Sequence, residues 1–190
     1  MILMLRVFVL HELIGGVRRL KHLKRVRALL LPLLLRHADH PSDLYSGRVN
    51  MILREANVAD VDELIGLHRR AWLAAYNEDI SREQFREVFS GNSSATVWVA
   101  LHGGELVGFC ECEAKGPHEV RSLEVAMLYV DPDRTGEGIG SLLLQRAIGD
   151  APAYVWTRPG GSQRFYEKHG FGADGEDATF AGMPVLRLVR

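Results

Sequence analysis

The segment Leu128-Tyr-Val-Asp-Pro-Asp-Arg-Thr-Gly-Glu-Gly-Ile-Gly-Ser141 decides the fold of this chain. An apolar strand runs through a turn that contains Pro132 into three alternate glycines, which open a helix. Glycine has no Cβ, so backbone N–H groups can approach an anion closely and adopt conformations that other residues resist. The N-terminus of the following helix adds unpaired donors and a favourable dipole. The segment therefore predicts a cradle for a phosphorylated ligand.

The spacing of Gly136, Gly138 and Gly140 excludes two common nucleotide-binding motifs. A P-loop requires G-x-x-x-x-G-K-[ST], and no lysine follows these glycines. A dinucleotide fingerprint requires G-x-G-x-x-G, whereas the spacing here is G-x-G-x-G. Taken alone, the glycines also fit a turn before an ordinary helix, because short motifs have many false positives. The surrounding sequence has to decide between these interpretations.

Composition and charge indicate a globular protein with an uneven charge distribution. The 190 residues are 47% hydrophobic and 25% charged, with a net charge of -1, which suits one domain with a real core. Residues 1–50 carry nine Lys and Arg against three acids, a net +6, while residues 51–190 carry fourteen against twenty-one, a net -7. The acidic main body argues against a nucleic-acid-binding face and favours a cationic or amine-bearing substrate.

Cys110 and Cys112 are the only cysteines. Two residues apart on a strand, they would point to the same face. Two cysteines allow neither a disulfide scaffold nor a four-cysteine zinc site. We expect buried thiols in a reducing cytoplasm, and no metal.

The first fifty residues differ from the rest. A basic stretch, 17–27, precedes an apolar run of eight residues, 28–35, which Pro32 interrupts. This run is far short of the about 20 residues that span a bilayer, and no good signal-peptide cleavage site follows it. A basic helix on a membrane or partner is one interpretation. We favour the other, an extension outside the fold translated from an early start, because Met51 directly precedes the first strand; the domain then covers 51–190.

The pattern of residues 51–190 predicts a mixed α/β fold. A strand at 51–55 is followed by two helices, each with a capping box, Asn57 with Asp60 and Ser81 with Gln84. A hairpin at 96–101 and 106–112 and a strand at 122–130 come next. The expected order is β-α-α-β-β-β-α-β-α-β with a further strand allowed, giving six to seven strands with helices on both faces. The remaining elements are expected at 136–148, 154–156, 162–169 and 185–189.

Three stretches together resemble the GCN5-related N-acetyltransferases, the GNAT family, across residues 51–190. The family motif R/Q-x-x-G-x-G/A falls on Thr135-Gly-Glu-Gly-Ile-Gly140 after the strand exit at 128–132. Arg164-Phe-Tyr-Glu-Lys-His-Gly-Phe171 is similar to the family's F-Y-E-K-x-G-F. Arg54-Glu-Ala with the helix ending Ala71-Trp-Leu-Ala-Ala-Tyr76 looks like a frequent opening of bacterial members.

The resemblance implies an acetyl-CoA-dependent N-acetyltransferase that acts by direct attack of a primary amine. The acceptor would be a small molecule or a protein, with no nucleic acid and no membrane span, and a homodimer is left open. In the family, backbone amides of the glycine segment hold the pyrophosphate of coenzyme A, and the pantetheine arm pairs with the preceding strand. The cofactor-binding residues implied are Leu128, Tyr129, Val130, Arg134, Thr135, Gly136, Glu137, Gly138, Ile139, Gly140 and Ser141.

Acetyl transfer to an amine requires a base, since a lysine amine has a pKa of about 10.4 and an α-amine about 7.7. The resemblance implies Glu124 as this base through a water, and alternation along a regular strand would put its side chain on the same face as Leu128. A solvated or salt-bridged carboxylate is the alternative. Tyr166 matches the family tyrosine that protonates the departing thiolate, with a packed aromatic beside Phe165 as the alternative. A backbone N–H near Leu128, where the family strand bulges, would serve the oxyanion.

The resemblance also implies that Trp72 and Tyr76 line the acceptor pocket, although core packing is the alternative, favoured slightly for Trp72. His68 and His169 have no ligand-like companions and are interpreted as structural or surface residues.

Three positions depart from the family pattern. Thr135 replaces Arg or Gln, with Arg134 beside it as a substitute; Pro159 replaces a frequent Asn; and Ser162 replaces a common Ala. These departures weaken the prediction of catalytic detail more than that of coenzyme A binding.

Two rival functions follow from the sequence: a non-catalytic coenzyme A binding module, and a docking protein that uses its basic N-terminus.

Overall fold

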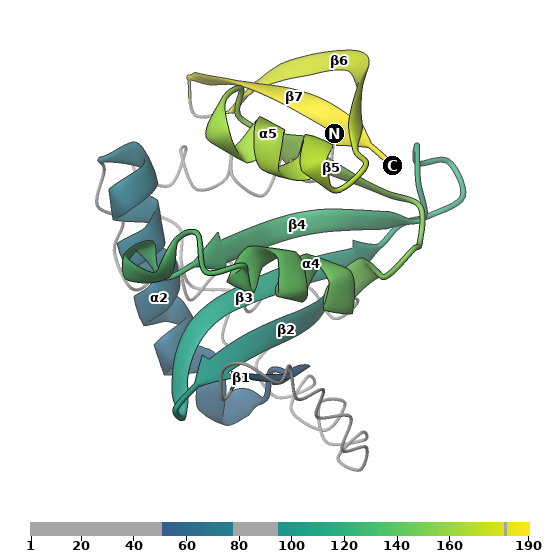
Figure 1. Cartoon of the computed structure of the whole chain (residues 1–190). Helices are drawn as coiled ribbons and strands as arrows, with labels where there is room; N and C mark the ends of the chain where they lie inside the picture. The colour runs from purple at the N-terminus through teal and green to yellow at the C-terminus, as the bar shows by residue number, and fades with distance from the viewer. Residues whose placement is uncertain (1–50, 78–94, 181) are drawn as a thin grey trace, which may run out of the picture.

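The computed structural model describes residues 51–77, 95–180 and 182–190. Seven strands form one mixed sheet in the order β1-β2-β3-β4-β5-β7-β6 (Figure 1). The strands are β1 Met51–Glu55, β2 Ala95–His102, β3 Glu105–Ala114, β4 Leu123–Val130, β5 Ala153–Thr157, β6 Gly172–Phe180 and β7 Met183–Val189. The helices are η2 Val58–Asp60, α2 Val61–Tyr76, η3 Pro132–Arg134, α4 Ile139–Ile148 and α5 Gly161–Lys168.

The pairing of the strands divides the sheet into two parts. Strands β1 to β4 form an antiparallel meander, and β5, β7 and β6 also pair antiparallel. The parts are joined by β4 and β5, which run parallel and pair only at Leu123 with Ala153 and at Glu124 with Tyr154. Beyond these pairs the two strands diverge (Figure 1).

The predicted capping box before the first helix is confirmed. The Asn57 side chain accepts a hydrogen bond of 2.8 Å from the Ala59 N–H, and Asp60 accepts one of 2.7 Å from the Asn57 N–H. Asp60 is also held by Arg54 of β1 at 2.7 Å. The box therefore ties the start of the helical segment to the first strand.

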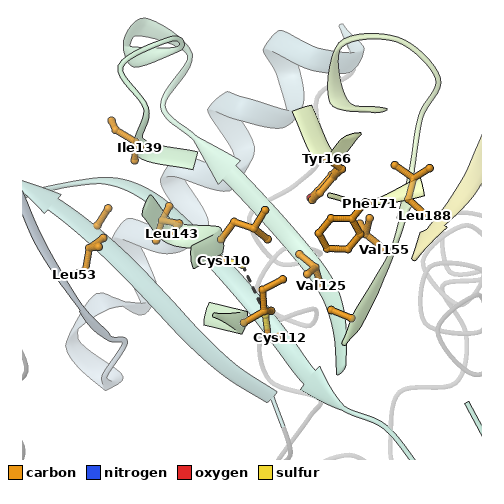
Figure 2. Close-up of a cluster of buried hydrophobic side chains, with 14 of the residues drawn as sticks. Leu53, Cys110, Cys112, Val125, Ile139, Leu143, Val155, Tyr166, Phe171 and Leu188 are labelled. Carbon is orange, nitrogen blue, oxygen red and sulfur yellow. Dashed lines mark hydrogen bonds between the residues drawn. The ribbon is translucent and has the colours of Figure 1, made fainter. Parts of the chain in front are cut away.

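The sheet carries a hydrophobic core on each face. Adjacent residues of β2 point to opposite faces and so belong to different cores. Val99 packs with the buried leucines of α2, whereas Ala100 packs with residues of α4. Gly108 of β3 permits the close approach of α4, because a Cβ there would lie 2.9 Å from Leu143. The core on the α4 side, part of which Figure 2 shows, joins side chains of six strands, β1 to β5 and β7, with those of α4 and α5. Helices on both faces are thus confirmed.

Several element bounds differ from those expected. The helix predicted after Ser81 lies outside the described residues. Helix α4 begins at Ile139 rather than at Gly136, because Gly136 and Gly138 adopt φ of 92° and 83°, outside the helical range. The expected order allowed one further strand after that at 185–189, whereas the structure has the additional strand, β6, before it. The sequence of β6 is acidic and contains Gly175, which adopts a φ of 92°.

A β-bulge in β4 corrects one inference about Glu124. Glu111 pairs with Met127 and Cys112 pairs with Val125, so Ala126 is an extra residue on β4. An extra residue reverses the alternation of side chains beyond it. Val125 and Leu128 both pack toward α4, while Met127 packs toward α2. Glu124 therefore lies on the face opposite to Leu128, and the expectation of a shared face is wrong.

Candidate active site

The divergence of β4 and β5 leaves one edge of β4 without a strand partner. Among the described residues, β4 pairs with β3 along its length but with β5 only at its first two residues. The backbone groups of Leu128, Tyr129 and Val130 on the β5 side are therefore open to an added strand. An extended ligand could bind this edge through main-chain hydrogen bonds.

The glycine segment lies directly after this free edge. Gly136 and Gly138 have positive φ, and a Cβ on either would meet no atom within 4 Å. Gly138 is the N-cap of α4, and no side chain caps this helix. The first N–H groups of a helix lack intrahelical partners and attract anions. The glycine segment thus presents open space and uncapped backbone donors at one end of the β4 edge.

Gly140 has a packing role beside the cradle. A Cβ at this position would lie 3.4 Å from the Phe165 ring, so Gly140 lets α4 and α5 approach each other closely. Because Phe165 precedes Tyr166, this contact also links the glycine segment to the predicted acid.

Thr135 and Arg134 are both engaged in local interactions. The Thr135 hydroxyl donates a hydrogen bond of 3.0 Å to the Pro132 carbonyl. Arg134 forms an ion pair of 3.5 Å with Glu137. Arg134 also lines an open pocket of about 490 Å³ beside α2, together with Arg70 and Asp131, which pair at 2.7 Å. The side chains of Thr135 and Arg134 therefore bind to neighbouring residues, and neither points a free donor into the glycine cradle.

Tyr166 is buried in the α5 side of the core, with 7% of its surface exposed. Its ring packs edge-on against Phe165 and Phe171, with ring centroids 5.1 and 5.5 Å away. Figure 2 shows Tyr166 beside Phe171. Burial raises the pKa of Tyr166, and the nearby Cys110 and Cys112 add to the rise. Tyr166 is therefore a protonated phenol at neutral pH, as a proton donor must be.

Glu124 is a buried carboxylate held by two groups, with 1% of its surface exposed. Lys115 Nζ lies 2.5 Å from Glu124 and 2.9 Å from Glu113, and the Tyr154 hydroxyl donates a hydrogen bond of 3.1 Å to Glu124. Burial raises the pKa of Glu124, while Lys115 and Tyr154 oppose the rise. Glu124 is thus salt-bridged rather than solvated, so the alternative of a structural ion pair stays open beside the role of base. The raised pKa makes the carboxylate a better proton acceptor.

An aromatic cluster lies on the α2 side of the sheet. Trp72 stacks on Tyr76 with centroids 4.2 Å apart, and His68 lies 4.4 Å from the Tyr129 ring. Burial raises the pKa of Tyr129, and Tyr76 and Tyr166 add to the rise. These three tyrosines come from α2, β4 and α5, and the ionisation of one is opposed by a charge on another. Burial also lowers the pKa of His68 to about 3, so that it is neutral at physiological pH.

Sequence reasoning missed Lys115, Tyr154 and Arg158. Lys115 and Tyr154 reach Glu124 only through the register of β3, β4 and β5, which no local pattern reveals. Arg158 follows β5 and lies over the Tyr76 ring, with 5.1 Å from its guanidinium carbon to the ring centroid. The only sequence feature that could have marked Arg158 as a site residue is its position next to Pro159, which lies in the family motif.

Cys110 and Cys112 lie side by side in the core, with their Sγ atoms 3.8 Å apart and no disulfide. Their interaction and burial raise the pKa of Cys110 well above its ordinary value. The Cys110 thiol therefore stays protonated at neutral pH. Within the described ranges, no cluster of His, Cys, Asp and Glu could hold a metal ion, and no helix there is long and apolar enough to cross a membrane.

Comparison with known proteins agrees with this geometry. Residues 93–172 match the acetyltransferase (GNAT) domain. A mycothiol acetyltransferase of Acidimicrobium ferrooxidans is 30% identical over 166 residues, which cover 81% of this chain. The chain spans about half the length of that relative, 53%.

Solved structures share the fold at low sequence identity. The PaiA N-acetyltransferase of Thermoplasma acidophilum, in complex with coenzyme A, has a TM-score of 0.57 at 20% identity, over 72% of this chain and 97% of its own. YncA of Salmonella typhimurium, solved with acetyl-CoA, has a TM-score of 0.60 at 18% identity, over 74% and 93% of the two chains. Motif, fold and sequence similarity agree, and residues 93–172 of the chain form a GNAT acetyltransferase domain.

Proposed function

We propose that residues 51–190 form an N-acetyltransferase domain that transfers an acetyl group from acetyl-CoA to a primary amine of a small molecule or protein. The observation that carries the proposal is the divergence of β4 and β5 after Glu124 and Tyr154. It puts a free strand edge between an uncapped glycine cradle and a buried, protonated tyrosine. Relatives of the same fold are described with coenzyme A or acetyl-CoA bound.

The residues present fit coenzyme A. Backbone N–H groups from Gly136 to Ser141 would hold the pyrophosphate, since the two positive-φ glycines leave room for it. The free edge at Leu128, Tyr129 and Val130 would pair with the pantetheine arm. Thr135 contributes backbone rather than its hydroxyl, which is bonded to Pro132. The bound cofactor supplies an activated thioester.

Glu124 and Tyr166 would move the two protons of the reaction. Glu124 takes a proton from the acceptor ammonium through a water, which frees the nitrogen lone pair for attack on the acetyl carbonyl carbon. The carbon–sulfur bond then breaks, and the Tyr166 hydroxyl donates its proton to the departing thiolate. The second proton of the attacking nitrogen leaves as the amide forms and returns Tyr166 to its phenol form. A backbone N–H at the bulge around Ala126 and Leu128 supports the oxyanion. Trp72 and Tyr76 contribute to the acceptor side.

Three further proposals concern the whole chain. Residues 1–50 are an extension that the reaction does not need. The two reduced, buried thiols support a cytoplasmic location. A homodimer is the assembly to examine, by light scattering.

A thiol-release assay with a panel of amines tests the proposed activity. Wild type is compared with Tyr166→Phe and Glu124→Gln, and coenzyme A binding is measured by calorimetry. Amine-dependent release that both substitutions slow supports the enzyme. Coenzyme A binding without amine-dependent release by any variant supports the non-catalytic module instead.

A further inference from the structure

Arg158 is an exposed arginine beside the aromatic cluster, one residue after β5 ends at Thr157. Its guanidinium carbon lies 5.1 Å from the centre of the Tyr76 ring. No carboxylate pairs with Arg158 in the described part of the chain. Three other arginines of the domain pair with a carboxylate: Arg54 with Asp60, Arg70 with Asp131 and Arg187 with Asp174, each at 2.7 Å.

The contact with Tyr76 orients Arg158 without using its hydrogen-bond donors. A guanidinium above an aromatic ring interacts through its face, and its N–H groups point outward in a planar fork. Such a fork matches the two oxygens of a carboxylate or of a phosphorus oxyanion. Arg158 is therefore held in place and still able to bind an anion.

The position of Arg158 relates it to the reacting groups. Tyr76 stacks on Trp72, and His68 lies between Trp72 and Tyr129 of the free β4 edge, with ring centroids 6.1 and 4.4 Å away. An anion bound by Arg158 would consequently lie near Trp72 and Tyr76 of α2, on the side of the proposed site where the acceptor binds.

The charges along β4 and β5 favour an acceptor with two charged groups. At the end where the strands pair, Glu113 and Glu124 share the single cation Lys115, leaving an excess of negative charge. At the end where the strands have diverged, Arg158 has no anionic partner among the described residues. An ammonium is attracted to the first end and an anion to the second.

On the basis of the proposed acetyltransferase function, we propose that Arg158 selects acceptors that carry an anionic group, of the carboxylate type, in addition to the primary amine that is acetylated. The substrate class is then an amino acid or a related amine with an acidic group, rather than a simple amine or a polyamine.

Matched pairs of acceptors test this inference. Several amino acids and their carboxamides are compared, since each pair differs in the carboxylate charge at nearly constant shape. The kcat/KM of each acceptor is measured for wild type, Arg158→Gln and Arg158→Lys, with Lys168→Gln as the control. Lys168 is an exposed cation in the last turn of α5, so its substitution changes the net charge equally.

Arg158→Gln is expected to lower kcat/KM for the amino acids by about 10- to 100-fold, mainly through the acceptor KM, because a hydrogen bond to a charged group is lost. The carboxamides should change by less than about twofold. Arg158→Lys should retain part of the preference and Lys168→Gln all of it. The quantity compared is the ratio of kcat/KM for an amino acid to kcat/KM for its carboxamide. The amine pKa differs between the two acceptors, but this difference is the same for wild type and variant, so it cancels when their ratios are compared.

Equal losses for amino acids and carboxamides would overturn the inference. An increased KM for acetyl-CoA with every acceptor would do so too, since Arg158 would then serve the cofactor. Thermal melting of each variant checks that it is folded. If wild type binds coenzyme A but acetylates no amine of the panel, the proposed activity itself fails, and the acceptor class with it.

Discussion

The Tyr154 hydroxyl donates a hydrogen bond of 3.1 Å to the Glu124 carboxylate, and these residues form the last pair at which β4 and β5 run together. The proposed base is thus anchored where the sheet opens. Lys115, which bridges Glu124 and Glu113, completes a buried group of charges there. Tyr154, Glu124 and Lys115 thus contribute both to the stability of the fold and to the proposed chemistry. Stability and activity must therefore be measured separately for each substitution.

Lys115→Met should lower the free energy of unfolding by about 3 kcal/mol, because it leaves a buried carboxylate without its cation. Without Lys115 the folded-state pKa of Glu124 rises further above 4.5. The folded protein then binds a proton more tightly than the unfolded chain does, so the deficit is complete above the folded pKa and shrinks as the pH falls toward 4.5. Urea denaturation at several pH values measures this, with the exposed Lys168→Met as control. A deficit that does not depend on pH would contradict the assignment.

Tyr166→Phe should reduce kcat by about 100-fold or more, since the proton donor for the thiolate is lost while the ring remains. Coenzyme A affinity, measured by calorimetry, should change little. The hydroxyl lies among buried groups, so thermal melting is measured alongside. Wild-type turnover in a folded Tyr166→Phe variant would remove Tyr166 as the acid.

Gly136→Ala should weaken coenzyme A binding by about tenfold or more, because a Cβ would occupy the cradle and strain the backbone. Gly175→Ala is a matched control: both glycines have φ of 92° and neither has an atom within 4 Å of an added Cβ. Gly175 lies in β6, away from the free edge of β4. Similar losses of affinity in both variants would mean that strain, rather than ligand contact, explains the effect.

His68 should make the protein sensitive to acid. Its pKa falls from 6.5 to about 3 on burial, so the unfolded chain binds a proton that the folded protein does not. Its contribution to stability is complete above pH 6.5 and is lost as the pH falls toward 3, by up to about 1.4 kcal/mol per pH unit. His68→Leu should have a correspondingly shallower loss of stability between pH 6 and pH 4 in urea titrations. An unchanged slope would show that His68 does not titrate as proposed.

Removal of residues 1–50 should leave kcat and KM unchanged if these residues are an extension. The same deletion tests the docking alternative, which predicts loss of binding to anionic vesicles or to a partner. Mass spectrometry of the native protein provides a second test. Detection of a peptide from residues 1–40 would contradict translation from Met51.

Much of the fold follows from local sequence signals. The capping box of Asn57 and Asp60, the β2–β3 hairpin and the glycine segment each depend on neighbouring residues, and each is present in the structure. Strand β6 is different. Its acidic sequence is typical of a loop, and it becomes a strand because β7 pairs with it.

The site follows from sequence only in part. Tyr166 and the glycines could be identified from motifs, whereas the partners of Glu124 depend on the pairing of three strands. The resemblance implies a bulge near Leu128, but regular alternation along β4 ignores it and therefore predicts the wrong face for Glu124. Arg158 and Tyr76 are far apart in sequence, and only the folded chain brings them together.

The most direct test of the account is the reaction itself. Purified wild-type protein is incubated with acetyl-CoA and the amine panel, while free coenzyme A is measured by thiol release and the products by mass spectrometry. The account predicts release of coenzyme A that depends on the acceptor, together with an acetylated amine, and a large loss of both in Tyr166→Phe. Coenzyme A binding with no acetylated product from any amine would contradict it.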